Sequence, residues 1–183
     1  MDIMEEAERK FKRAVEVTGE EFGTIRTGRA SPILLERLNV NYYGTSTPLN
    51  QISTVSAPEA RLLIIQPYDR NAIAEIEKAI TQSDLGFVPS DDGQVIRVPV
   101  PQLTEDRRKD LGKLVRTRAE EGRVAVRNIR RDADKLLRDE EKNGQSTKDD
   151  LHRDLESVQK LTDKYIKDID ELMEKKIKEL MEI

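Results

Sequence analysis

Apolar residues along this chain follow the three-and-four spacing of an amphipathic helix in three long segments. The first segment covers about residues 2–28, where the spacing approaches that of a heptad seam. Gly28 is suited to end this helix, and Pro32 prevents an easy restart. The pattern therefore predicts a long first helix with one apolar stripe. The stripe residues are Met4, Ala7, Phe11, Ala14, Thr18, Phe22 and Ile25.

Helical spacing returns in the C-terminal part of the chain. Thr104 is a good N-cap, and an acidic first turn follows it in a helix that we expect to run to about residue 141. Residues 143–145, Asn-Gly-Gln, break the pattern, and either Ser146 or Thr147 can cap a third helix. The expected apolar stripes are Leu111, Leu114, Val115, Ala125, Ile129, Ala133 and Leu136 on the second helix, and Leu151, Leu155, Val158, Leu161, Tyr165, Ile169, Leu172, Ile177 and Leu180 on the third.

The segment from about residue 33 to 103 has a different texture. It holds six of the seven prolines and three of the four tyrosines, and its apolar runs are short. Alternation predicts strands near residues 38–42, 62–65 and 95–100, and a short helix is expected at 71–83. Asp91-Asp92-Gly93 is a plausible hairpin turn. This segment is therefore predicted to form a small mixed β/α unit.

The three stripes determine how these parts combine. A helix with one apolar stripe is unstable alone in water, and three such helices can bury their stripes together in a bundle. The predicted class is α+β: an elongated three-helix bundle made of residues 1–29 and 104–183, with a small β/α/β domain, residues 32–101, inserted in it. The chain crosses between the parts at 29–32 and 101–104, where we expect a hinge. The hinge residues are Arg29, Ala30, Ser31, Pro32, Pro101, Gln102, Leu103 and Thr104.

Positive charge is concentrated on the second helix. Residues 107–131 carry ten Lys/Arg and three Asp/Glu, although the whole chain has a net charge of −4. Four arginines are separated by seven, four and three residues, so they share a face, which we expect to lie opposite the apolar stripe. The natural partner of such a row is a phosphate backbone, and arginine suits bidentate phosphate contacts. The row comprises Lys109, Lys113, Arg116, Arg123, Arg127 and Arg130.

Two other interpretations of these charges remain open. The row can be a solvated helix face, and part of it can pair with the third helix, because residues 139–183 carry 14 Asp/Glu against nine Lys/Arg. Arg26 and Arg29, which flank Gly28, either complement the end of the first helix, make additional phosphate contacts or stabilise the hinge.

Several functional classes are disfavoured by what the chain contains. It has no cysteine and one histidine, His152, so no metal site and no cofactor are expected. It lacks a Gly-x-x-x-x-Gly-Lys phosphate loop, and its carboxylates lie on exposed helices, where nothing tunes a catalytic pair. No run approaches the ~18 apolar residues of a membrane helix, and the N-terminus does not resemble a signal peptide. We therefore expect a soluble cytoplasmic protein.

Six sequence motifs follow one another along the chain. They lie at residues 25–32 (IRTGRASP), 42–45 (YYGT), 83–86 (SDLG), 96–99 (IRVP), 103–111 (LTEDRRKDL) and 123–132 (RVAVRNIRRD). Several motifs in register are more specific than any single one, and together they extend over nearly the whole chain. In these motifs the chain resembles one family, the ribosome recycling factors.

The resemblance implies a fold and a function. Members of this family combine a three-helix bundle with an inserted β/α/β domain through a flexible two-strand hinge, and they resemble a tRNA in outline. They bind large-subunit RNA of the post-termination ribosome and, with elongation factor G and GTP, split it into subunits and release it from mRNA. The Arg-Asn-Ile-Arg-Arg segment then makes Arg127, Arg130 and Arg131 the contacts to ribosomal RNA, with Arg130 the strongest candidate. A non-enzymatic protein that is monomeric in solution is expected.

Two rival functions make different predictions. A helical adaptor that binds proteins through its charged faces would show little salt-dependent binding to RNA. A hydrolase acting on nucleic acids through its acidic residues would bind divalent metal ions and turn over substrate.

Overall fold

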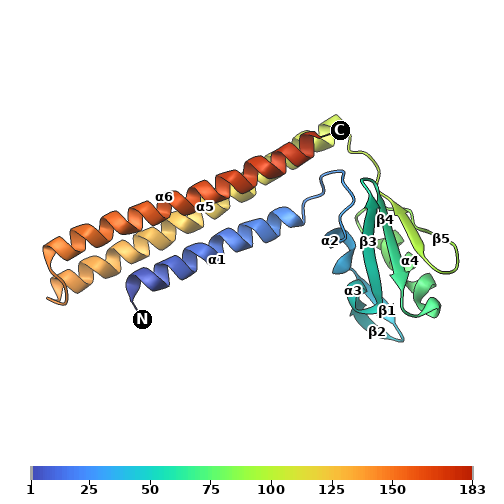
Figure 1. Ribbon diagram of the computed structural model, residues 1–183, viewed down its shortest axis with the longest axis horizontal. Coiled ribbons are helices and arrows are strands. Elements are labelled where there is room, and N and C mark those ends of the chain that lie inside the picture. The colour runs from blue at the N-terminus through green and yellow to red at the C-terminus, as the bar shows by residue number, and fades with distance from the viewer. Residues whose placement is uncertain (1, 183) are drawn as a thin grey trace. The chain divides into compact units, whose positions relative to one another are not determined.

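A computed structural model describes residues 2–182 of the chain, which form two compact units. One unit contains the described residues up to Ile25 and from Arg108 onward, and the other is Arg26–Arg107. Long helices make up the first unit, and small sheets with short helices make up the second (Figure 1). The predicted α+β class is confirmed. The bundle ends at Ile25 and resumes at Arg108, so the segments proposed as a hinge are counted with the second unit.

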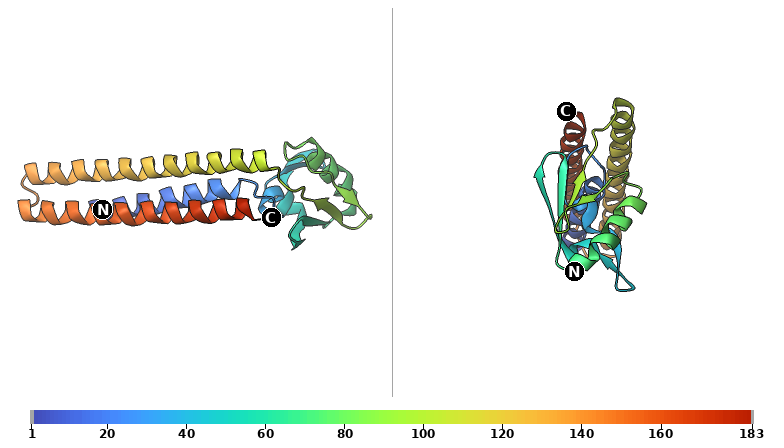
Figure 2. Two further views of the ribbon diagram at one scale, coloured as in Figure 1. Left: turned by 90° about the horizontal axis from the view of Figure 1, so that it is seen from above. Right: turned by 90° about the vertical axis from the view of Figure 1, so that its right-hand side faces the viewer.

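Three helices build the first unit: α1 (Ile3–Gly23), α5 (Glu105–Lys142) and α6 (Lys148–Met181). The prediction that Gly28 ends the first helix is wrong, because α1 already ends at Gly23 and is capped by Thr24. They run side by side in both views that show their length (Figures 1 and 2). The 38 residues of α5 span roughly 57 Å. Of the two predicted caps for the last helix, Thr147 is the one used, in a capping box with Asp150. The side-chain oxygen of Asp2 accepts a hydrogen bond from the backbone N–H of Met4 and caps α1.

The core of the bundle confirms most of the stripe predicted for the first helix. Phe11 of α1 is fully buried and stacks on Tyr165 of α6, with 5.4 Å between the ring centroids. Further along, Thr18 lies against Gly122 of α5 so closely that a Cβ atom at Gly122 would stand 2.5 Å from the Thr18 hydroxyl oxygen. This glycine therefore lets α1 and α5 approach. The buried stripe residues of the first segment are Ala7, Phe11, Thr18, Phe22 and Ile25.

The stripe predicted for the second helix is wrong in part. Leu114, Ala125 and Leu136 are exposed in α5. The buried row instead passes through small residues, because these allow the neighbouring helix backbones to come close. The residues buried on α5 are Leu111, Gly112, Val115, Ala119, Gly122, Val126, Ala133 and Leu137.

The second unit contains two antiparallel sheets. One pairs β1 (Asn39–Tyr42) with β2 (Thr45–Pro48). The other has four strands in the order β3-β4-β6-β5. Its strands are β3 (Ser53–Glu59), β4 (Leu62–Pro67), β6 (Ile96–Pro99) and β5 (Ser90–Asp91). The helical pieces are α2 (Ile33–Glu36), α3 (Leu49–Ile52), the 3-10 turn η1 (Arg70–Ala72) and α4 (Ile73–Gln82).

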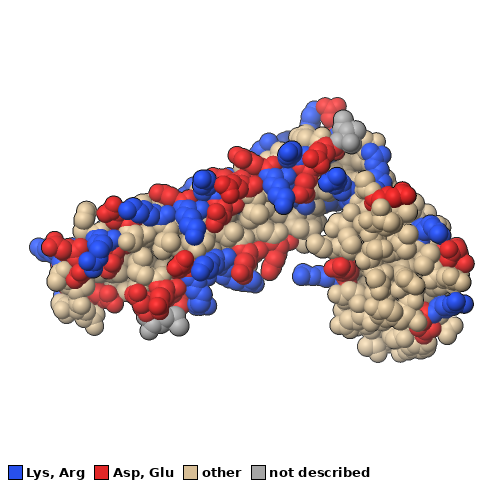
Figure 3. Space-filling model, viewed as in Figure 1, with Lys and Arg blue, Asp and Glu red and all other residues tan. Residues whose placement is uncertain are grey.

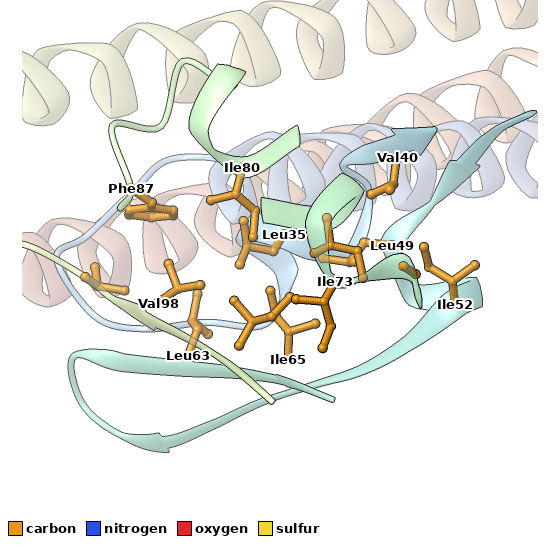
Figure 4. Packing of buried hydrophobic residues seen from close by; sticks show 14 residues of the cluster. Leu35, Val40, Leu49, Ile52, Leu63, Ile65, Ile73, Ile80, Phe87 and Val98 are labelled. Carbon is orange, nitrogen blue, oxygen red and sulfur yellow. The ribbon is translucent and has the colours of Figure 1, made fainter. Parts of the chain in front are cut away.

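A single apolar cluster joins these elements (Figure 4). Strand β4 alternates, so Leu63 and Ile65 are fully buried, and the three-and-four spacing of α4 buries Ile76 and Ile80 against the same cluster. The strands predicted near residues 38–42, 62–65 and 95–100 and the helix predicted at 71–83 are confirmed within a few residues. The predicted Asp91-Asp92-Gly93 turn is also confirmed, since the Asp92 N–H donates to the Val95 carbonyl and β5 pairs with β6.

Candidate nucleic-acid interface

The seven residues expected to contact RNA all lie on α5, and we call them the basic stripe. Arg116, Arg123, Arg127 and Arg130 flank the buried row of α5. Lys113 and Arg131 lie close to the opposite side of the helix. Arg123 and Arg127 directly follow the buried Gly122 and Val126, a rotation of about 100°. Arg130 lies about one turn beyond Val126. The prediction that the four arginines lie opposite the buried row is therefore wrong, because this row is shifted toward small residues. The basic stripe is Lys109, Lys113, Arg116, Arg123, Arg127, Arg130 and Arg131.

Arg123 is the stripe residue most closely tied to the bundle, with a side chain only 18% exposed. Its Nη2 lies 2.6 Å from Asp170 Oδ1 on α6, and its Nη1 donates to Glu120 at 3.1 Å. Burial by itself lowers the pKa of Arg123, and the hydrogen bonds with Asp170 and Glu120 outweigh it and raise the pKa. Arg123 therefore pairs with the acidic third helix, which was one of the two other interpretations of the basic row.

Glu120 connects two arginines of the basic stripe. Its Oε1 accepts from Arg127 Nη1 at 3.0 Å, and its Oε2 accepts from Arg123 Nη1 at 3.1 Å. The pKa of Glu120 is lowered, first by the bond from Arg127 and then by the bond from Arg123. Arg127 keeps 41% of its side chain exposed, so it can still meet an anion.

Arg130 reaches across to α6. Its Nη1 donates to Gln159 Oε1 at 3.0 Å, and Gln159 Nε2 in turn donates to Asp163 Oδ1 at 2.9 Å. The Arg130 Nε atom is buried without a hydrogen bond and stands 4.0 Å from Asp134 Oδ2. A neutral amide therefore orients the guanidinium. Its positive charge is compensated only weakly, by Asp134 at 4.0 Å.

The remaining stripe residues are more open. Lys109, Lys113, Arg116 and Arg131 are all exposed. Lys113 and Arg116 make no side-chain hydrogen bond or ion pair with any residue that the structure describes, while Arg131 Nη1 donates to Asn128 at 3.4 Å. On the face of the bundle seen in Figure 3, by contrast, basic and acidic side chains alternate.

Arg26, a candidate for an additional phosphate contact, is used inside the second unit. Its Nη2 donates to the Pro101 carbonyl at 2.6 Å, and its guanidinium lies 5.3 Å from the centre of the Phe87 ring. The pKa of Arg26 is lowered, chiefly by burial and then by the nearby charge of Arg107. Arg29, the other candidate, is exposed.

The segments proposed as a hinge have several fixed contacts within the second unit. The Ala30 N–H donates to the Ala60 carbonyl at 2.7 Å. Gly28 has a φ of 81°, and a Cβ atom there would meet the side chain of the buried Leu103 at 3.6 Å. Three further hydrogen bonds involve these segments, between Ser31 and Leu34, Gln102 and Arg61, and Thr104 and Arg107. Pro32 is the N-cap residue of α2.

The described residues form neither a metal-binding cluster nor a membrane-spanning helix. Across residues 2–182, no group of three or more His, Cys, Asp or Glu side chains could hold a metal ion. None of the helices described is long and apolar enough to span a membrane.

Comparisons with known proteins agree with one another. The family model described as "Ribosome recycling factor" matches residues 18–181. The ribosome-recycling factor of Halalkalibacterium halodurans is 55% identical over 182 residues, covering 100% of this chain and 98% of that protein. The chain belongs to the ribosome recycling factor family. The ribosome-recycling factor of Moorella thermoacetica is 56% identical with the same coverage.

Solved structures of ribosome recycling factors share this fold. A solution structure of a ribosome recycling factor matches with a TM-score of 0.78 and 46% identity, over 100% of this chain and 97% of that one. Another match, with a TM-score of 0.68, 45% identity and full coverage of both chains, is a model of the T. thermophilus ribosome recycling factor and E. coli elongation factor G bound to the E. coli post-termination complex.

The charge pattern did not reveal Gln159 and Asp163, which together orient Arg130. Gln159 is uncharged, and Asp163 is one of many acids on α6. Only the packing of α5 on α6 brings them to the basic stripe.

Proposed function

We propose that the protein is a translation factor that acts with elongation factor G and GTP to split the post-termination ribosome into subunits and release it from mRNA. The observation that carries this proposal is the basic stripe along α5, in a chain that matches ribosome recycling factors over its whole length. A similar protein has been placed together with elongation factor G on a post-termination complex, which supports the same partners here.

The bundle is proposed to dock on large-subunit ribosomal RNA through the basic stripe. Arg127, Arg130 and Arg131, with the exposed Lys109, Lys113 and Arg116, would meet phosphates, because each keeps a cationic head at or near the surface. Arg123 is proposed to act mainly as a support, since Asp170 and Glu120 already neutralise most of its charge.

The second unit is proposed to move against the bundle about residues 29–32 and 101–104 when elongation factor G acts on it. Hinges of this kind are a few residues at element ends that absorb a change in backbone angles. The hydrogen bond from Arg26 to the Pro101 carbonyl ties the two crossings to each other within the second unit. Bending would then concentrate at the bundle side of this contact.

The protein is proposed to be a cytoplasmic, monomeric and non-enzymatic factor without a cofactor of its own. The sequence has no phosphate-cradling loop, so the energy for splitting would come from the GTP that elongation factor G hydrolyses. Carboxylates on the surface of α5 and α6 form ion pairs with basic neighbours, as Glu121 does with Arg118 and Asp150 with Arg153, which disfavours the rival hydrolase.

The direct test is a splitting assay on post-termination ribosomes followed by light scattering. We expect scattering to fall only when the protein, elongation factor G and GTP are all present. Binding to ribosomes without any splitting would favour the rival adaptor. Turnover of nucleic acid that depends on a divalent metal and persists through purification would favour the hydrolase.

A further inference from the structure

The tip of the β1–β2 hairpin holds a tyrosine in a backbone conformation that side chains rarely adopt. Tyr43 and Gly44 connect the two strands with φ angles of 49° and 82°. Positive φ at both central residues defines a type I′ turn, in which the first position usually holds Asn or Asp. Tyr43 is also 73% exposed, so burial of its ring does not compensate for the backbone. The turn itself gives no reason for an aromatic residue here.

The Tyr43 ring is nevertheless held in place. Its hydroxyl donates to Asp69 Oδ2 at 2.5 Å, and its ring packs edge-on against Tyr42 with 4.6 Å between centroids. Asp69 also accepts from the backbone N–H of Asn71 at 2.9 Å. The pKa of Asp69 is lowered, first by the Tyr43 hydroxyl and then by the Asn71 N–H. An exposed ring fixed in this way presents a defined face.

A cavity of about 240 Å³ lies beside this ring. Its walls include Tyr42 and Tyr43 from the hairpin and Glu75 from the first turn of α4, with Asn41 and Asn71 at its polar side. Glu75 is half-buried, and within residues 2–182 its carboxylate has no hydrogen bond or ion pair. The cavity thus combines two aromatic rings with one uncompensated negative charge.

The net charge of this part of the chain disfavours an anionic partner. Residues 33–101 carry five Lys/Arg and eight Asp/Glu, so this part of the chain is acidic, in contrast to the basic stripe on α5. A phosphate backbone would be repelled at Glu75. A guanidinium or ammonium group is attracted both by an aromatic face and by a carboxylate.

We propose that this cavity receives an arginine or lysine side chain of elongation factor G. This inference rests on the proposed function, which makes elongation factor G the protein that acts on the second unit. The Tyr43 ring supplies the cation–π face, and Glu75 supplies the charge. Asn41 holds the turn in place, because its Oδ1 accepts from the Gly44 N–H at 2.9 Å. This role explains a tyrosine at position 43, because asparagine would fit the backbone of the turn better but has no aromatic ring.

The test uses full-length variants in which the fold is preserved. Tyr43→Asn removes the ring and suits the type I′ turn, and Glu75→Gln removes the charge at constant shape. Tyr68→Asn is the matched control, because Tyr68 is 71% exposed on the same unit and lies outside the cavity. Two quantities are measured: co-sedimentation with post-termination ribosomes without elongation factor G, and the rate of splitting as elongation factor G is titrated.

Tyr43→Asn and Glu75→Gln should bind ribosomes like the unchanged protein. They should raise the elongation factor G concentration for half-maximal splitting roughly three- to thirtyfold. Tyr68→Asn should leave this concentration unchanged. An unchanged titration for Tyr43→Asn and Glu75→Gln would overturn the proposal. Loss of ribosome binding before elongation factor G is added would also overturn it, since the cation would then belong to the ribosome. If the unchanged protein splits no ribosomes, the proposed function itself has failed.

Discussion

Arg130 of α5 donates through Nη1 to Gln159 Oε1 of α6 over 3.0 Å, and Gln159 donates in turn to Asp163 over 2.9 Å. The hydrogen-bond acceptor for the arginine is therefore a neutral amide. The Asp163 carboxylate stands one residue further away, and the Asp134 carboxylate lies 4.0 Å from Arg130 Nε, too far for a hydrogen bond. This arrangement orients the guanidinium without cancelling its charge. Arg123 shows the opposite arrangement, a direct pair with Asp170 at 2.6 Å. Two arginines seven residues apart on one helix are thus suited to different roles.

Changes at Gln159 should alter ribosome binding through Arg130. Gln159→Ala should weaken binding roughly two- to fivefold, because an oriented hydrogen bond is lost. Gln159→Glu should weaken binding more than Gln159→Ala, since a carboxylate at this distance would neutralise the arginine. Equilibrium co-sedimentation measures both. In an Arg130→Ala background neither change should have an effect, and an equal loss there would show that Gln159 acts independently of Arg130.

The pair of Arg123 and Asp170 should matter for stability more than for binding. Asp170→Ala should lower the free energy of unfolding by about 1–2 kcal/mol, because it leaves a largely buried guanidinium without its main partner. Urea denaturation gives this quantity. The affinity of the folded variant for ribosomes should change less than twofold. A large loss of affinity at unchanged stability would assign Arg123 to the RNA contact instead.

Gly122 should not tolerate a side chain. Gly122→Ala places a Cβ atom 2.5 Å from Thr18 Oγ1 and 3.2 Å from Ile169 Cδ1, so α1 must shift. We expect a loss of about 1–3 kcal/mol in thermal or urea unfolding. Gly112→Ala is the matched control on the same helix, since only the flexible end of Arg116 lies near, at 3.5 Å. The control should be neutral or stabilising by up to about 1 kcal/mol. Equal effects of the two changes would contradict this packing.

The carboxylates of Glu77 and Asp91 should give the second unit a measurable pH dependence. A hydrogen bond with Asp91, together with burial, raises the pKa of Glu77 to about 6. A carboxyl group whose pKa is raised in the folded state binds its proton more tightly when the chain is folded. Protonation of Glu77 therefore stabilises the folded state at low pH, and this stabilisation is lost as the pH rises from about 4.5 through 6. Asp91→Asn should therefore raise the melting temperature at pH 7, and this gain should vanish at pH 4.5. The same gain at both pH values would rule out the coupling.

The sequence predicted the helices better than it predicted which faces they bury. Thr104, Thr147 and the Asn-Gly-Gln break mark helix ends by local chemistry, and local chemistry is readable from sequence. The buried face of α5 was predicted wrongly because it contains Ala119 and Gly122, small residues that let neighbouring helices pack closely. Larger apolar residues such as Leu136 stay exposed.

Elements without an apolar pattern escaped prediction as well. Strand β2, with the sequence Thr-Ser-Thr-Pro, has no apolar alternation, and β3 is largely exposed at the edge of its sheet. The candidate site was found from charge spacing within one helix. Its orienting partner, Gln159, comes from another helix, and no pattern within either segment encodes that contact.

The central claim, that the basic stripe docks on ribosomal RNA, is tested most directly by the salt dependence of binding to isolated large subunits. The protein is compared with a variant in which Arg127, Arg130 and Arg131 are all alanine, and circular dichroism verifies that helical content is equal. Affinity should fall as salt rises, and the variant should bind more weakly with a log–log slope shallower by about 2–3, because each phosphate contact contributes about 0.7–0.9. Equal affinity and equal slope for the two proteins would contradict the account.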